Sequence, residues 1–148
     1  MATTREKQMT LSIYLNFGGN CREVFEFYRS VFGGEFEILQ TFGDGPGDMD
    51  VPEDELDDIM HVSFRIGSSV LMGSDMPSGF GPPVQMGNNF SISYTTESKE
   101  QTDDLFAKIS EGGTVSMPPA DMFWGSYFGS CTDKFGVNWQ FNYDPPQE

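Results

Sequence analysis

The feature that most constrains the fold of this chain is one pattern of apolar spacing that occurs twice. Residues 10–17 alternate apolar and polar side chains, as a half-buried strand does. The next segment places Val24, Phe27, Tyr28 and Val31 on one stripe of a helix. Three strand-like segments follow, and the second half of the chain then repeats the same order. The chain therefore reads as two copies of one unit, each a strand, a helix and three strands.

Signals at the helix ends set the boundaries of these two units. Asn20 with Glu23, and Ser98 with Gln101, have the capping-box spacing of a helix start, and a pair of glycines ends each helix. A stretch rich in Gly and Pro separates the two units. We predict a single domain over 1–148, with a first module over 10–74, a linker over 75–88 and a second module over 89–144.

The alternation divides the strand side chains between two faces of the predicted sheet. The apolar face suits burial under two amphipathic helices, so we expect an α+β fold of two βαβββ modules that form a cupped mixed sheet with helices on the outer face. The opposite face carries mainly small hydroxyl and amide side chains: Ser12, Tyr14, Asn16, His61, Ser63, Arg65, Ser91, Ser93, Asn138, Gln140 and Asn142. Because this face has so little charge, we predict that it lines a concave pocket for a small organic ligand. A plain solvent-facing sheet is the alternative.

The charge balance limits the partners of the chain. It has 8 basic and 23 acidic residues, for a net charge of −15. Nucleic acids and anionic membranes require Lys and Arg, so we expect neither as a partner. The acidic residues concentrate between Asp44 and Asp58, where the spacing does not fit a calcium-binding EF-hand loop. We predict a solvated loop there.

The start of the chain and its cysteines indicate a cytoplasmic protein. The first ten residues lack the apolar core of a signal peptide, and no apolar run approaches the about 20 residues of a membrane helix. Cys21 and Cys131 show neither zinc-site nor redox-motif spacing. A reducing compartment is the simplest expectation.

Five segments, in this order, resemble a known family. They are Tyr14-Leu15 before Gly19-Asn20-Cys21, Phe27-Tyr28 with Phe32-Gly33, Asp75-Met76-Pro77-Ser78-Gly79, Phe123-Trp124-Gly125, and Thr132-Asp133-Lys134-Phe135-Gly136-Val137. The chain resembles the vicinal oxygen chelate superfamily, which includes glyoxalase I, bleomycin-resistance proteins and extradiol dioxygenases, and within it the PhnB-like branch. The resemblance spans roughly residues 10–144. It implies two modules whose strands curl around a ligand, and we expect a homodimer.

The resemblance also raises the question of a metal ion. In metal-using relatives, His and Glu from four strands hold a divalent ion that acts as a Lewis acid. This chain departs from that pattern, because Gln140 stands where such relatives carry Glu, and the first-strand position falls on Ser12 or Tyr14. His61, the single histidine, and Gln140 remain weak candidate ligands. We expect no metal at these positions and no certain cofactor, with a divalent metal as the alternative.

A few side chains are candidates for chemistry or for ligand contact. His61 is the candidate catalytic residue, with a hydrogen-bonded structural histidine as the alternative. Cys21, at a helix start whose dipole lowers a thiol pKa, and Cys131 are weaker nucleophile candidates, and small buried side chains otherwise. Trp124 belongs to an aromatic cluster that could wall the pocket, line a dimer contact or fill the core.

The sequence leaves three functions open. It contains no G-x-G-x-x-G, P-loop, G-x-S-x-G or H-E-x-x-H motif, which gives no support to the ubiquinone-methyltransferase label that some relatives carry. We predict a PhnB-like glyoxalase/bleomycin-resistance/dioxygenase superfamily protein with a concave small-molecule pocket and no specific activity assigned. One alternative is a non-catalytic protein that binds or sequesters a small ligand without a metal. The other is a divalent-metal-dependent lyase, isomerase or dioxygenase-type enzyme.

Overall fold

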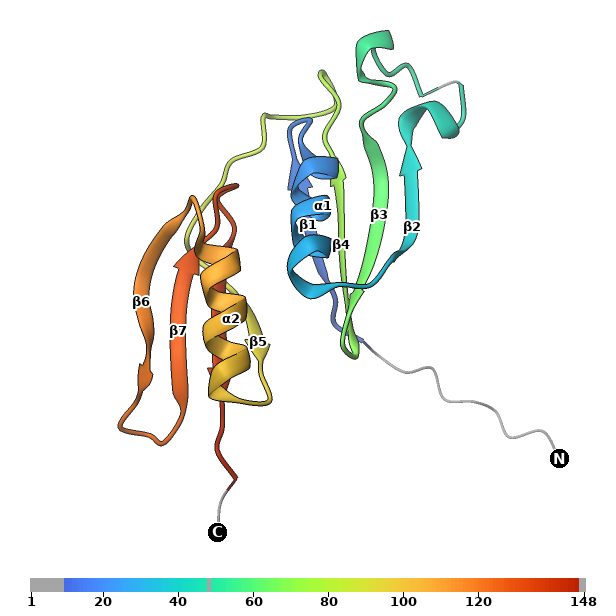
Figure 1. Ribbon diagram of the computed structural model, residues 1–148. Helices are drawn as coiled ribbons and strands as arrows, with labels where there is room; N and C mark the ends of the chain where they lie inside the picture. The colour runs from blue at the N-terminus through green and yellow to red at the C-terminus, as the bar shows by residue number, and fades with distance from the viewer. Residues whose placement is uncertain (1–9, 48, 147–148) are drawn as a thin grey trace, which may run out of the picture.

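Each half of the chain forms one βαβββ module in the computed structural model, which describes residues 10–47 and 49–146 (Figure 1). The first module consists of β1 (Ile13–Phe17), α1 (Cys21–Phe32), β2 (Phe36–Thr41), β3 (Ile59–Ile66) and β4 (Ser69–Asp75). The second consists of β5 (Ile92–Thr95), α2 (Lys99–Ser110), β6 (Thr114–Asp121), β7 (Tyr127–Thr132) and β8 (Asn138–Tyr143). The predicted α+β class with its doubled βαβββ pattern is confirmed.

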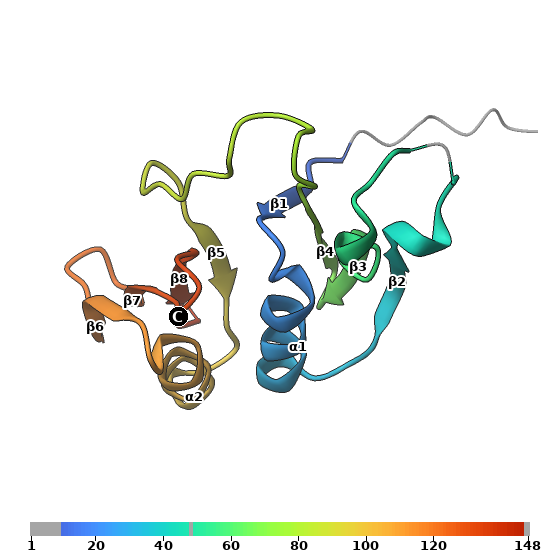
Figure 2. The same ribbon diagram turned by 90° about the horizontal axis from the view of Figure 1, so that it is seen from above.

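The strands form two mixed sheets with the same internal order. The first sheet runs β1-β4-β3-β2 and the second β5-β8-β7-β6. In each sheet, the first and last strands of the module pair in parallel, and the other pairs are antiparallel. The described strands pair only within their own sheet, so the predicted mixed sheet is built from two four-stranded halves. Both helices lie on the same side of the two sheets (Figure 2).

The predicted apolar face lies under the helices and forms one core. Its buried side chains include Leu15, Phe17, Val62, Phe64, Leu71, Ile92, Trp139 and Phe141. The alternation also assigns Ile13 and Phe90 to this apolar face, but the structure leaves both exposed. Phe90 is 58% exposed because it precedes β5, and Ile13, at the start of β1, is 38% exposed. The alternation in the sequence therefore identifies the buried face, except at the strand ends.

Helix α1 packs against both modules and joins them. The ring of Tyr28 lies 5.2 Å from that of Trp139 on β8, centroid to centroid, and Phe32 lies 5.2 Å from Tyr94 on β5. Phe27 also meets Phe135 in the turn after β7. These edge and tilted contacts are the favoured geometries for aromatic pairs. The two modules consequently share one core instead of having a core each.

The start of α1 is stabilised by a residue that is distant in the sequence. Asn20 makes no side-chain capping bond, so the predicted capping box at this helix is wrong. Asp75, buried at the end of β4, accepts instead from the backbone N–H groups of Gly19 and Cys21 at 2.9 Å, and from that of Ile59 at 2.8 Å. One carboxylate thus connects the helix start to two strands of its module.

The start of α2 follows the sequence prediction. Ser98 Oγ accepts from the backbone N–H of Gln101 at 3.0 Å, and the side chain of Gln101 accepts from the N–H of Glu97 at 2.7 Å. Both bonds satisfy N–H groups that a helix start leaves unpaired. The local signal at this helix is therefore sufficient without help from another element.

Candidate functional site

The linker between the modules is fixed at both ends and arches over a hollow. At its start, the N–H of Met76 donates to Phe17 O at 2.7 Å, and Ser78 donates through its N–H and its hydroxyl to Glu55 Oε1. At its far end, Asn138 Nδ2 donates to the carbonyl oxygens of Gly87 at 2.9 Å and of Phe90 at 3.1 Å. The linker segment 79–86 spans the space between these two sets of bonds.

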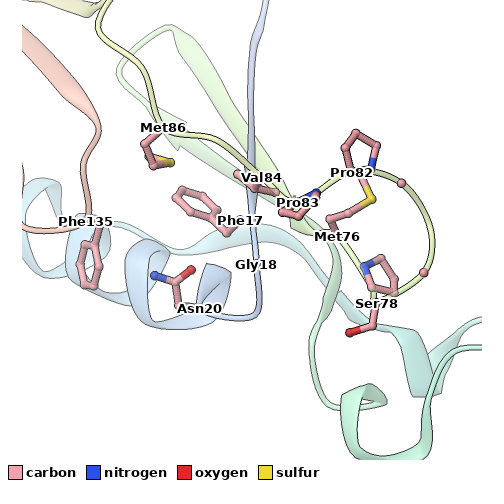
Figure 3. A pocket seen from close by; sticks show the side chains of 13 residues that line it. Phe17, Gly18, Asn20, Met76, Ser78, Pro82, Pro83, Val84, Met86 and Phe135 are labelled. Carbon is pink, nitrogen blue, oxygen red and sulfur yellow. The ribbon is translucent and has the colours of Figure 1, made fainter.

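This hollow, which we call the linker hollow, has two lobes that share five lining residues. The first lobe has a volume of about 540 Å³ and lies beside the start of α1. Side chains from the linker, the end of β1 and the turn after β7 surround it (Figure 3). The second lobe, of about 410 Å³, lies between β1 and the start of β8. The shared residues are Phe17, Met76, Pro82, Val84 and Met86.

Three of the pocket residues predicted from the sequence line the second lobe. Tyr14 and Asn16 come from β1 in the first module, and Asn138 comes from β8 in the second module. Apolar side chains of the linker, including Met86, complete the wall. The lobe thus brings together two stretches of the predicted polar face that are more than half the chain apart. The sequence did not predict that the linker would form its third side.

Tyr14 also connects this lobe to the single histidine. Its hydroxyl lies 3.2 Å from His61 Nδ1, and the two rings are stacked with centroids 5.7 Å apart. The hydroxyl can donate to a bare Nδ1 or accept from Nδ1–H, so the contact is compatible with either tautomer of the neutral imidazole. His61 therefore has the hydrogen-bonding partner that a general base or a ligand-binding histidine needs.

The other predicted pocket residues lie elsewhere on the two sheets. Ser93 lines a separate cavity of about 420 Å³ between the β3–β4 turn and β5. Arg65 pairs with Glu37 at 2.8 Å on the surface. The lining of the linker hollow does not include Ser12, Ser63, Ser91, Trp124 or Gln140. A common pocket for these residues stays a prediction.

The donor set on the polar faces does not match a divalent-metal site of the kind found in metal-using relatives. Within residues 10–47 and 49–146, no three His, Cys, Asp or Glu side chains lie close enough together to hold an ion. The partner that His61 does have is a phenol, a poor match for the imidazole and carboxylate ligands that such ions prefer. Asp75, at the end of β4, uses both its oxygens to accept hydrogen bonds from backbone N–H groups.

Both cysteines are buried and shielded from chemistry. Burial, followed by the charge of Asp75, raises the pKa of the Cys21 thiol far above its ordinary value. Burial and the Asp75 carboxylate thus outweigh the helix dipole, and Cys21 is the small buried side chain that was the alternative expected from the sequence. Burial also raises the pKa of Cys131 to about 12, with a smaller contribution from Asp133. Neither thiol has the electropositive, accessible surroundings of a nucleophile.

Asp133 has a structural role. In the sequence it was named only as part of a segment that carries the family resemblance, and no role was assigned to it. It is 3% exposed, and its Oδ2 accepts from the hydroxyl of Tyr28 at 2.6 Å and from Trp139 Nε1 at 3.0 Å. Its Oδ1 accepts from the N–H groups of Phe135 and Val137. The turn before β8, and with it Asn138 in the second lobe, is therefore tied to α1 of the first module. The signal for this role in the sequence is an Asp within a turn motif.

The chain has relatives along almost its full length. Residues 9–142 match the family described as 3-demethylubiquinone-9 3-methyltransferase. The chain is 31% identical over 146 residues to Protein YjdN of Escherichia coli K12, which covers 90% of this chain and 95% of that protein.

Two solved structures are similar in both sequence and fold. The structure of PA1353 from Pseudomonas aeruginosa has 39% identity and a TM-score of 0.82, covering 93% of this chain and 98% of that one. The structure described as a putative 3-demethylubiquinone-9 3-methyltransferase, PhnB protein, from Bacillus cereus has 25% identity and a TM-score of 0.72, covering 91% and 99%. Glyoxalase-related structures share the fold alone, at 14% and 18% identity.

Among the described residues, neither helix combines the length and the apolar character needed to cross a membrane. The cytoplasmic location stays a prediction.

The family matches, together with the doubled βαβββ fold, confirm the resemblance seen in the sequence. The chain belongs to the 3-demethylubiquinone-9 3-methyltransferase (PhnB-like) family, and it shares its fold with glyoxalase/bleomycin resistance/dioxygenase structures.

Proposed function

We propose that this protein binds a small organic molecule in the second lobe of the linker hollow. The observation that carries the proposal is the meeting of Tyr14, Asn16 and Asn138, from both modules, around one cavity of about 410 Å³. That volume lies within the roughly 300–1,000 Å³ of ligand pockets. A mostly apolar wall with a few polar groups from separate elements is also the usual composition of such sites.

The site is held in shape before any ligand arrives. Asn138 is fixed by two bonds to linker carbonyls and by a third, from Thr132 Oγ1 to its own Oδ1 at 2.7 Å. Tyr14 is fixed by its contact with His61. A ligand would therefore order few additional side chains on that side of the cavity, which reduces the entropic cost of binding.

A thermal-shift screen of small organic molecules tests the proposal. Val84→Trp places a large side chain in the hollow from the linker, without changing a strand or helix. Val115→Trp makes the same change on β6, at a residue that is 47% exposed and outside the hollow. We expect compounds that stabilise the unmodified protein to lose their effect on Val84→Trp and to keep it on Val115→Trp. Equal stabilisation of both variants would refute the site.

A second candidate function is favoured by the contact between Tyr14 and His61. His61 does not line the hollow itself but contacts Tyr14, which does, and a histidine so placed can act as a general acid or base when a substrate lies within reach. Mass spectrometry of the compounds identified by binding would show whether the protein converts them to a product. Loss of conversion in His61→Gln, with binding retained, would support an enzyme. Unchanged conversion in that variant would rule out this role for His61.

The methyltransferase activity in the family description is not part of this proposal. A nucleoside-bearing methyl donor usually meets a glycine-rich loop between a strand and a helix start. The corresponding glycines here, Gly18 and Gly19, precede α1, and Asp75 takes the N–H groups of Gly19 and Cys21. The N–H groups of Gly19 and Cys21 are therefore not available to such a donor.

We also propose that two copies of the chain associate through the sheet faces that the helices leave open. Ile38 on β2 is 43% exposed and lies opposite Ser63 on that face, and Met117 on β6 is 43% exposed opposite Ser130. Burial of such apolar side chains against a second copy would stabilise a dimer.

Sedimentation equilibrium tests this association. We expect a mass twice the 16.5 kDa of one chain. Ile38→Lys should shift the protein toward the monomer, whereas Val115→Lys should not, because Val115 lies opposite Cys131 on the helix side of its sheet. A monomer at every concentration would contradict the proposal.

A further inference from the structure

We infer that the ligand of the linker hollow is an uncharged, largely apolar molecule, and that the hollow rejects anions such as phosphonates and carboxylates. The inference rests on the proposed function and adds the chemical class of the ligand. It is carried by the side chains that line the two lobes and by the positions of the charged groups around them.

The first observation is the composition of the lining. Neither lobe is lined by a single charged side chain, although the chain as a whole carries a net charge of −15. The polar side chains that line the second lobe are the phenol of Tyr14 and the amides of Asn16, Gln85 and Asn138. An anion that left water for this site would lose its hydration without meeting a counter-charge, which is strongly unfavourable. An uncharged molecule incurs no such penalty.

The second observation is that two charged groups beside the hollow, Lys134 and Glu55, are already engaged. Lys134 directs its ammonium group over the rings of Phe27, at 4.5 Å, and Phe135, at 5.4 Å. Glu55 accepts two hydrogen bonds from Ser78 at the edge of the first lobe. The two ring faces hold the Lys134 ammonium group beside Phe27 and Phe135, and the negative charge of Glu55 would oppose a ligand anion at the edge of the first lobe.

The remaining described basic residues are committed elsewhere in the same way. Arg29, Arg65, Lys99 and Lys108 form ion pairs with carboxylates, and Arg22 donates to a backbone carbonyl. Within the part of the chain that the structure describes, every Lys and Arg side chain therefore has a partner, and of these partners only Phe135, beneath Lys134, lines the hollow. The summed negative charge also lowers the local concentration of anions near the protein.

The third observation concerns the apolar wall. Met76, Met86 and Phe90 are 36%, 49% and 58% exposed, so a ligand in the hollow would remove apolar surface from water. Methionine side chains are unbranched and polarizable, and they adjust to ligands of different outline. Burial of this wall stabilises the complex with an apolar ligand, and a charged group placed against the wall gives no such stabilisation.

Three phenyl compounds of similar size test the inference: acetophenone, phenyltrimethylammonium and phenylphosphonate. Their dissociation constants are measured by NMR titration on the unmodified protein and on Val84→Trp and Met86→Trp, which block the lobe from two positions of the linker. We expect acetophenone to bind at least about ten-fold more tightly than phenylphosphonate, and to lose affinity in both blocked variants. Gln85→Lys supplies the missing cation and should create phenylphosphonate binding, whereas Ser116→Lys on β6 should not.

The possible failures are distinct. If phenylphosphonate binds the unmodified protein as tightly as acetophenone, and the blocked variants lose it, the inferred ligand class is wrong while the proposed site stands. If acetophenone binds equally well to the unmodified protein and to both blocked variants, the site itself is wrong. If none of the three compounds binds the unmodified protein, both the site and the ligand class are contradicted.

Discussion

The hydroxyl of Tyr28 donates to Asp133 Oδ2 at 2.6 Å, across 105 residues of sequence, and joins the helix of the first module to the turn before the last strand. Both residues are buried, and Trp139 Nε1 donates to the same oxygen. Burial, followed by the charge of Asp133, raises the pKa of Tyr28 far above its ordinary value, so the phenol keeps its proton and remains a donor. The bond fixes the position of one module on the other, and therefore the two sides of the linker hollow.

Removal of the hydroxyl in Tyr28→Phe should destabilise the protein by about 2 kcal/mol, since a buried carboxylate loses one of its donors. Urea unfolding measures the loss. Tyr127→Phe is the matched control, because Tyr127 donates to Asp103 at an exposed site, and should cost much less. Equal losses in the two variants would show that the buried hydrogen bond contributes no more to the free energy of unfolding than the exposed one.

Asp75→Asn should also destabilise the fold. The carboxylate accepts hydrogen bonds from three backbone N–H groups, and the amide N–H₂ of Asn would face at least one of these donors. A buried donor left without an acceptor costs about 1–3 kcal/mol. The exposed Asp144, which accepts from Asn142, provides the control Asp144→Asn, with a smaller expected loss. Thermal unfolding by circular dichroism compares the two, and a larger loss in the control would contradict this role of Asp75.

The two helix starts should respond differently to alanine. Ser98→Ala removes a capping bond and should cost about 1 kcal/mol. Asn20→Ala removes no capping bond and should cost less than about 0.5 kcal/mol, because Asp75 performs that role. Chemical denaturation of both variants gives the comparison. The reverse order would mean that Asn20, and not Asp75, stabilises the start of α1.

Asp58 should make stability depend on pH in a defined direction. Burial, followed by the charges of Asp75, Glu55 and other acidic neighbours, raises the pKa of its carboxyl. A carboxyl whose pKa is higher in the folded than in the unfolded state destabilises the fold once it is ionised, and this penalty disappears as the pH falls through the two pKa values. Asp58→Asn should therefore stabilise the protein at neutral pH, by less than about 1 kcal/mol at this partly exposed site. The gain should vanish in acid, and a gain independent of pH would exclude the charge as its cause.

The features that could be predicted from the sequence are those set by neighbouring residues. The repeat, the buried faces of the strands and the cap at Ser98 all follow from short-range patterns. The features that were missed depend on residues brought together from far apart. Asp75 replaces Asn20 as the helix cap from 54 residues away, and the Tyr28–Asp133 bond spans the two modules.

The candidate site shows the same division. Alternation correctly identified Tyr14, Asn16 and Asn138 as polar-face residues, and the structure brings these three together. The composition of the linker predicted a loop and no more, because its place over the hollow depends on the anchoring bonds from Glu55 and Asn138. Those bonds carry no signature within the linker itself.

The central claim is that the linker hollow binds a small uncharged molecule, and methyl NMR of the nine methionines tests it most directly. The methyl groups of Met76 and Met86 line the hollow, whereas Met117 lies on β6 outside it. Titration with acetophenone should shift the signals of Met76 and Met86 together, to saturation, and leave that of Met117 unchanged. Shifts centred on Met117, or no saturable shift at Met76 and Met86, would contradict the account.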